Sequence, residues 1–164
     1  TRNGSRQTQV TPSRKAQASR IASKRIIDES VLYDLNGNID AGEQLLTENR
    51  HKDGVIETDS GLQYRIIKSG SGRTPKLGDQ VTAHMRGTLI NGHVFSDTYA
   101  KGQPLNLPVA QVIKGLSEGL KLVNEGGKIK LFIPPALAYG NKSAGSNIPA
   151  GSTLIYEVEL IKIN

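Results

Sequence analysis

The sequence has no cysteine and no tryptophan, and only two of its 164 residues are phenylalanine. Without cysteine, disulfides, thiolate nucleophiles and thiolate metal sites are excluded. The three histidines, at positions 51, 84 and 93, are too widely spaced to indicate a multi-histidine metal site. No apolar run reaches the length of about 18 residues that a membrane-spanning helix needs. We therefore expect neither a thiolate nor a multi-histidine metal site. Because aromatic residues are so few, each should matter for a core or a pocket.

The net charge of +6 is distributed unevenly along the chain. Residues 1–27 contain seven basic residues and no acid, whereas residues 28–59 contain nine acids against Arg50 and Lys52. A basic segment of this kind is typical of a solvated tail, of a nucleic-acid contact or of a contact with an anionic surface. Because it lacks the interleaved aromatic residues of single-strand binders, we do not expect a nucleic-acid partner. Its low apolar content predicts a flexible basic arm over residues 1–12.

A helical segment is expected over residues 13–53. Apolar residues recur at a spacing of four (Ile27, Val31, Leu35), which predicts a helix from about Ser13 to a stop at Asn36-Gly37. A second short helix is expected from about Ala41 to Asn49. These helices carry too little apolar surface to fold alone, so we expect them to pack on the main domain or on a second copy of the chain.

The predicted turn between these helices, residues 34–43, carries oxygen-bearing side chains at alternate positions, as a calcium loop does. It spans ten residues where an EF-hand loop needs about twelve, and Ile39 stands where that loop needs glycine. An Asx-rich turn accounts for the same residues, so calcium is not expected.

After Thr58 the pattern becomes that of β-strands. Strands are expected over residues 62–68, 80–90, 93–98, 128–133 and 153–163, and Asn91-Gly92 predicts a hairpin between the second and the third. Helical spacing returns over residues 112–123, and residues 138–151 form a loop rich in glycine, proline and serine. In the last strand, alternation places Leu154, Tyr156, Val158, Leu160 and finally Lys162 on one face. One short helix within an antiparallel sheet defines an α+β domain.

Five motifs follow one another over residues 54–164: residues 60–64 (SGLQY), 87–95 (GTLINGHVF), 111–115 (QVIKG), 133–140 (IPPALAYG) and 148–156 (IPAGSTLIY). In order and spacing they resemble the FK506-binding protein (FKBP) family of peptidyl-prolyl cis–trans isomerases. The likeness is greatest to the bacterial branch of macrophage infectivity potentiator and FkpA-type foldases. The resemblance implies a strongly curved antiparallel sheet wrapped around one short helix, preceded here by the helical segment and the basic arm.

The resemblance also implies a reaction and the residues that perform it. An Xaa–Pro amide isomerises slowly because twisting it breaks resonance, and a dry apolar pocket favours the less polar twisted form. No nucleophile or cofactor is needed. By resemblance the catalytic residues are Tyr139, Ile113 and Phe95, with the Ile113 N–H as donor to the carbonyl before the proline. The implied substrate-binding residues are Val112, Leu116, Met85, Asp97, Leu105, Leu107, Ile148 and Tyr156.

Three positions depart from the family pattern. Met85 stands where the family has tyrosine, Leu116 stands where it has tryptophan, and Phe95-Ser96-Asp97 replaces Phe-Asp-Ser. Shifting the carboxylate by one residue along a strand turns it to the opposite face. These departures predict a wider but still apolar pocket, weak or altered isomerase activity and poor binding of FK506-like macrolides.

Two functions therefore stay open. The chain is either an isomerase that assists folding of proline-containing, partly unfolded proteins, or an FKBP-fold binding or chaperone module without useful catalysis. The resemblance further implies a homodimer formed through the helices of residues 13–53. The absence of cysteine, together with a start at Thr1 rather than Met, suits a processed protein of the bacterial cell envelope or periplasm, with the cytoplasm as the alternative.

Overall fold

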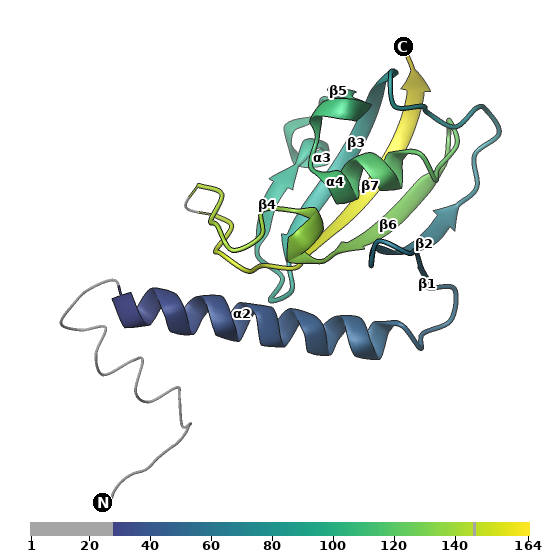
Figure 1. The fold of residues 1–164 in the computed structure, drawn as a ribbon. Coiled ribbons are helices and arrows are strands. Elements are labelled where there is room, and N and C mark those ends of the chain that lie inside the picture. The colour runs from purple at the N-terminus through teal and green to yellow at the C-terminus, as the bar shows by residue number, and fades with distance from the viewer. Residues whose placement is uncertain (1–27, 146) are drawn as a thin grey trace, which may run out of the picture.

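A computed structural model of the chain describes residues 28–145 and 147–164. The predicted basic arm over residues 1–12 and the predicted helix start near Ser13 lie outside these described residues. The described part consists of a long helix followed by a sheet that curves around a shorter helix, as Figure 1 shows.

Seven antiparallel strands make up the sheet in the described residues, in the order β1-β2-β6-β7-β3-β4, with β5 also pairing with β3. Their bounds are β1 Ile56–Glu57, β2 Gln63–Lys68, β3 Gln80–Leu89, β4 Val94–Asp97, β5 Leu105–Pro108, β6 Lys128–Ile133 and β7 Leu154–Ile163. The predicted α+β class and the five predicted strands are confirmed. The short strands β1 and β5 were not predicted, because neither shows a buried alternating pattern.

The last strand, β7, lies at the centre of the sheet between β6 and β3. Its buried and exposed positions alternate as predicted from Leu154 to Leu160. The prediction that Lys162 shares this face is wrong: a register shift opposite Thr82 and Ala83 turns Lys162 outward and buries Ile163 in its place.

The helix α4 (Lys114–Leu120) packs against the sheet through two glycines. A Cβ atom on Gly115 or Gly119 would collide with Ile133 or Leu131 of β6, so only glycine permits this close approach. Leu116 and Leu120 of the same helix are buried in the core. The helix begins two residues later than predicted because Val112 and Ile113 are extended, after the 3₁₀ turn η1 (Val109–Gln111).

A single helix, α2 (Asp28–Asn49), occupies the region where two helices and a turn were predicted. The predicted stop at Asn36-Gly37 is wrong, and residues 34–43 lie on a helix rather than in a calcium loop. Tertiary contacts override the turn chemistry: Asn38 Nδ2 donates to the Ala150 carbonyl at 2.9 Å instead of serving a local turn. Within the described ranges, no group of three or more His, Cys, Asp or Glu side chains is placed to hold a metal.

The helix α2 runs along one end of the sheet (Figure 1) and is fixed near its C-terminus by buried polar side chains. Asn49 Nδ2 donates to Gln63 Oε1 at 2.8 Å, and Gln63 Nε2 donates to the Leu46 carbonyl at 2.9 Å. No helix in the described part of the chain has the length and hydrophobicity needed to cross a membrane.

Candidate functional site

The candidate site begins where β3, β4 and β7 bring two aromatic rings together. Phe95 and Tyr156 meet edge to face, with ring centroids 5.5 Å apart. They converge on Gly87 of β3, where a Cβ atom would lie 2.7 Å from the Phe95 ring. Phe95 reaches this face because β4 carries an extra residue between Val94 and Ser96, opposite Gly87 and Thr88. A glycine and a bulge together build the aromatic wall.

The second wall comes from the junction between η1 and α4. Leu116 is buried in the core, and Val112 and Ile113 are half-buried against it. The Ile113 N–H lies before the first turn of α4, so the helix supplies no acceptor for it. Within the described residues no other acceptor takes it either. A backbone donor beside an apolar surface can therefore hold a ligand carbonyl.

The long loop after β6 contributes Tyr139 and Ile148. Ile148 is buried, whereas Tyr139 is 39% exposed. The loop is held in shape by hydrogen bonds from Gly140 N–H to the Pro135 carbonyl at 2.8 Å and from Gly151 N–H to the Gly140 carbonyl at 3.0 Å. Burial raises the pKa of the Tyr156 hydroxyl, and the neighbouring Tyr139 hydroxyl adds to this rise. The two side chains are thus close enough to interact electrostatically, and the Tyr156 hydroxyl stays protonated near neutral pH.

Met85 lies in the core beside these residues, fixed by a threonine that sequence reasoning did not single out. The Thr98 hydroxyl, at the start of α3 (Thr98–Lys101), is buried and accepts a hydrogen bond from the Met85 N–H at 2.9 Å. The same hydroxyl lies 2.7 Å from His84 Nδ1. The only sequence signal for this role is a threonine directly after the carboxylate that caps a short helix.

Asp97 lies outside the core cluster that contains Tyr156 and against which Phe95 packs. It pairs in register with the exposed Arg86, on the face opposite Phe95, and its Oδ2 lies 3.6 Å from Arg86 Nε. Its Oδ1 accepts hydrogen bonds from the Tyr99 and Ala100 N–H groups and caps α3. Ser96, which pairs with Gly87, faces the site instead.

The structure brings most of the other predicted residues together. Those in or packed against one core cluster are Met85, Phe95, Leu107, Val112, Ile113, Leu116, Ile148 and Tyr156. Leu105, on β5, is 41% exposed and lies outside that cluster. The arrangement offers apolar walls, a free backbone donor and a phenolic hydroxyl, with no nucleophile or paired acid and base among them. Such a site can bind and polarise a peptide, but it has no group for covalent catalysis.

This fold and this set of residues define a domain of the FKBP type. The family of FKBP-type peptidyl-prolyl cis-trans isomerases matches residues 71–161, and the domain amino-terminal to that isomerase matches residues 3–66. The chain belongs to this family.

Individual relatives are bacterial FKBP-type proteins. A probable FkpA from Neisseria meningitidis is 45% identical over 130 residues, which cover 79% of this chain and 48% of the relative. The FKBP-type 22 kDa isomerase of Escherichia coli is 48% identical over 122 residues, which cover 74% of this chain and 59% of the relative. The chain thus spans about half the length of these curated relatives.

A solved structure confirms the likeness in three dimensions. The crystal structure of FkpA from Escherichia coli superposes with a TM-score of 0.81 and 34% identity, covering 96% of this chain and 75% of that one. Because 96% of this chain is covered, the match extends beyond residues 71–161.

Proposed function

We propose that this protein is a peptidyl-prolyl cis–trans isomerase that assists the folding of proline-containing, partly unfolded proteins. The observation that carries the proposal is the free Ile113 N–H beside the apolar surface of Val112, Leu116 and Tyr156. The N–H holds the carbonyl that precedes the proline, while the proline ring lies on the apolar surface. Desolvation there favours the twisted amide, whose charge separation is smaller than that of the planar form.

The remaining roles follow from the positions of the side chains. Phe95 packs edge to face on Tyr156 and forms the aromatic wall, and the exposed Tyr139 offers its hydroxyl to the bound peptide. The other substrate-binding residues that we propose are Met85, Leu105, Leu107 and Ile148. Asp97 is not among them, because it caps α3 on the other face.

The test is an exchange assay on a short Xaa-Pro peptide, followed by NMR. Tyr139→Ala should lower kcat/KM about tenfold or more, since it removes both a wall and a hydroxyl. Tyr139→Phe removes only the hydroxyl and so measures its contribution to the rate. Tyr99→Phe is the matched control, because it removes a hydroxyl that donates to Glu159 at 2.7 Å on the other face. A wild-type rate equal to the uncatalysed rate would overturn the proposal.

An alternative is a binding or chaperone module that has kept the surface and lost useful catalysis. It is favoured by the replacement of family aromatics by Met85 and Leu116, both buried, which leaves an apolar surface with fewer rings. Under this alternative the protein suppresses aggregation of a refolding client without accelerating Xaa-Pro exchange. Measuring both activities on the same preparation, with Tyr139→Ala, separates the two functions.

The N-terminal match supports a further proposal about assembly and location. We propose that residues 13–53 form a homodimer contact, as a helical segment with little apolar surface of its own would need. Light scattering should then give a mass near twice 17.7 kDa.

We also propose the bacterial cell envelope or periplasm as the compartment, in keeping with a cysteine-free sequence and bacterial relatives. Fractionation of the cells that naturally express the protein, with immunodetection of each fraction, tests this location against the cytoplasm.

A further inference from the structure

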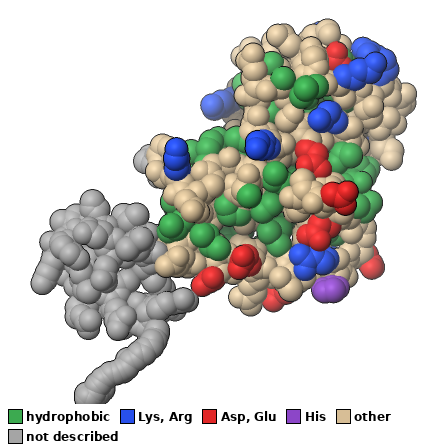
Figure 2. Space-filling model, in the orientation of Figure 1, with side chains coloured by type: hydrophobic (Ala, Val, Ile, Leu, Met, Phe, Trp, Pro, Cys, Tyr) green, Lys and Arg blue, Asp and Glu red, His purple; other side chains and the backbone are tan. Residues whose placement is uncertain are grey.

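The domain that carries the candidate site contains more basic than acidic residues. Residues 60–164 hold twelve bases and six acids. On the face that Figure 2 shows, basic side chains lie among hydrophobic ones over the domain, and acidic side chains gather toward α2. A peptide that approaches the site therefore meets a predominantly positive domain, and charges on the peptide should affect its affinity.

The six acids of residues 60–164 are all engaged by other groups. Five of them accept hydrogen bonds from backbone N–H groups or hydroxyls: Asp79, Asp97, Glu118, Glu125 and Glu159. The sixth, Glu157, has its Oε1 3.7 Å from Lys128 Nζ. By strand register, Asp97, Glu157 and Glu159 lie on the sheet face opposite Tyr156. These carboxylates therefore do not neutralise a base beside the site.

The residue of β4 that faces the site is itself neutral. Ser96 pairs in register with Gly87, the residue over which the rings of Phe95 and Tyr156 meet. The next residue, Asp97, is turned to the opposite face. The aromatic wall thus presents a hydroxyl rather than a carboxylate to a bound peptide, and an acidic side chain on that peptide is not repelled there.

Lys114 places a positive charge beside the backbone donor of the site. It follows Ile113 directly and begins α4. It is exposed and forms no ion pair within the described residues. A positive charge in the first turn of a helix is unfavourable, because the helix dipole is positive at that end. The charge of Lys114 therefore does not stabilise α4, but it lies one residue from the N–H that we propose holds the peptide carbonyl.

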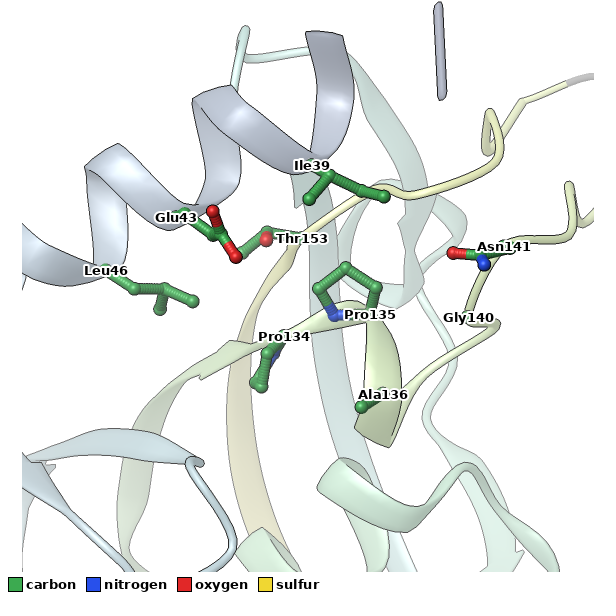
Figure 3. A pocket seen from close by; sticks show the side chains of 9 residues that line it. All are labelled: Ile39, Glu43, Leu46, Pro134, Pro135, Ala136, Gly140, Asn141 and Thr153. Atoms are coloured by element: carbon green, nitrogen blue, oxygen red, sulfur yellow. The ribbon is translucent and has the colours of Figure 1, made fainter. Parts of the chain in front are cut away.

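Lys142 stands in the same relation to Tyr139. Its N–H donates to the Tyr139 carbonyl at 3.2 Å, so a tight turn keeps the two residues together. The intervening Gly140 and Asn141 line a cavity of about 480 Å³, and Figure 3 shows them across this cavity from Leu46 of α2. Lys142 is exposed and, in the part of the chain that the structure describes, has no carboxylate within ion-pair distance.

We propose that Lys114 and Lys142 make the site selective for Xaa-Pro segments that carry an acidic side chain close to the proline in sequence. This inference rests on the proposed function for the place where the peptide binds, at Ile113 and Tyr139. A lysine ammonium is a point charge on a flexible stem, so aspartate and glutamate should both be accepted. The client class is therefore acidic, proline-containing segments of partly unfolded proteins.

The test uses three matched peptides, acetyl-Z-Ala-Leu-Pro-Ala-Z-amide, in which Z is glutamate, glutamine or lysine. Their affinities for the full chain are measured from the amide NMR shifts of Ile113 and Tyr139. An exposed ion pair changes affinity about twofold to fivefold, so the glutamate peptide should bind most tightly and the lysine peptide least. The differences should nearly disappear at about 1 M salt, where charges are screened beyond about 3 Å.

Charge variants assign the preference to particular residues. Lys114→Gln and Lys142→Gln should each reduce the ratio of glutamate-peptide to glutamine-peptide affinity about twofold. Lys121→Gln is the matched control, because Lys121 is an exposed lysine at the other end of α4, and it should leave the ratio unchanged. Ser96→Asp should also lower the ratio by adding a negative charge at the aromatic wall, whereas the neutral Ser96→Asn should not.

Two results would overturn the selectivity: equal affinity for the three peptides, or a wild-type ratio in the double variant Lys114→Gln, Lys142→Gln. Exchange rates of the same peptides report separately on the proposed function. Uncatalysed rates with all three would overturn the isomerase, whereas the affinity order glutamate, glutamine, lysine would still support the selectivity. Accelerated exchange with equal affinities would do the reverse.

Discussion

The ring of Phe95 stands at 86° to the ring of Tyr156, and both rings lie over the Cα of Gly87. The glycine is therefore part of the site, although it contributes no side chain to it. Its role is to leave room, and that role can be removed by a single methyl group.

We predict that Gly87→Ala displaces both rings. The new Cβ would lie 2.7 Å from Phe95 and 2.9 Å from Tyr156. Such overpacking costs about 1–3 kcal/mol of stability. It should lower kcat/KM for Xaa-Pro exchange about tenfold, because the wall that contacts the proline moves. Gly78→Ala is the control, since no atom lies within 4 Å of its Cβ position. Unchanged activity in Gly87→Ala would mean that the rings do not form the binding wall.

The second prediction concerns the carboxylate at Asp97, which stands one residue after its position in the family pattern. Ser96→Asp restores an acid on the face of Gly87, so it should raise affinity for an FK506-like macrolide, measured by calorimetry. Leu116→Trp should raise the isomerase rate if the lost aromatic ring limits it. Asp97→Ala should do neither, although it costs about 1 kcal/mol by uncapping α3. If Ser96→Asp leaves the macrolide affinity unchanged and Leu116→Trp leaves the isomerase rate unchanged, the departures from the family pattern do not weaken the site.

Two glycines of α2 should respond in opposite directions to alanine. Gly37→Ala should stabilise the protein by about 0.5–1 kcal/mol, because nothing lies within 4 Å of its Cβ position and alanine favours helix. Gly42→Ala should destabilise it, because the methyl group collides with Thr153 and lifts the helix from the domain. Urea unfolding of the pair measures both effects. Equal shifts would show that the helix does not rest on Thr153.

A pH dependence follows from Glu57. Hydrogen bonds from Arg50, at 3.0 Å and 3.1 Å, and from Gln63 lower the pKa of the Glu57 carboxyl. A carboxyl whose folded pKa is depressed stabilises the fold above its unfolded pKa, near 4.5, and this contribution disappears as the pH falls through the lower folded value. The advantage of wild type over Glu57→Gln should be small, because solvent screens this exposed pair. This advantage should shrink as the pH falls below 4.5 and disappear once Glu57 is protonated in the folded protein, which urea unfolding at a series of pH values measures.

Much of the fold could be predicted because its signals are local. The alternation in β3 and β7 and the Asn-Gly turn fix strands and hairpin within short windows, and the motif order identifies the family. The Asn36-Gly37 stop was wrong because a contact 112 residues away, from Asn38 to Ala150, decides the conformation there. No local window contains that information.

The candidate site was predictable to a similar degree. Family motifs point to Phe95, Ile113 and Tyr139. In the structure, Phe95 and Ile113 pack against the core cluster that contains Tyr156. The motifs do not reveal that Asp97 caps α3 or that Thr98 fixes Met85, because both roles depend on where strand β4 ends. The cavity that Leu46 of α2 lines together with Pro134 could not be predicted from the sequence, since it forms between segments that are distant in the chain.

The central place of β7 has a consequence for synthesis on the ribosome. This strand forms the ladders that join β6 to β3, yet it is the last of these elements to be translated. Until it emerges, β6 and β3 have unpaired edges and the core lacks Leu154, Val158 and Leu160. A nascent chain in this state exposes strand edges that invite aggregation. The chain is therefore prone to aggregation for most of its own synthesis.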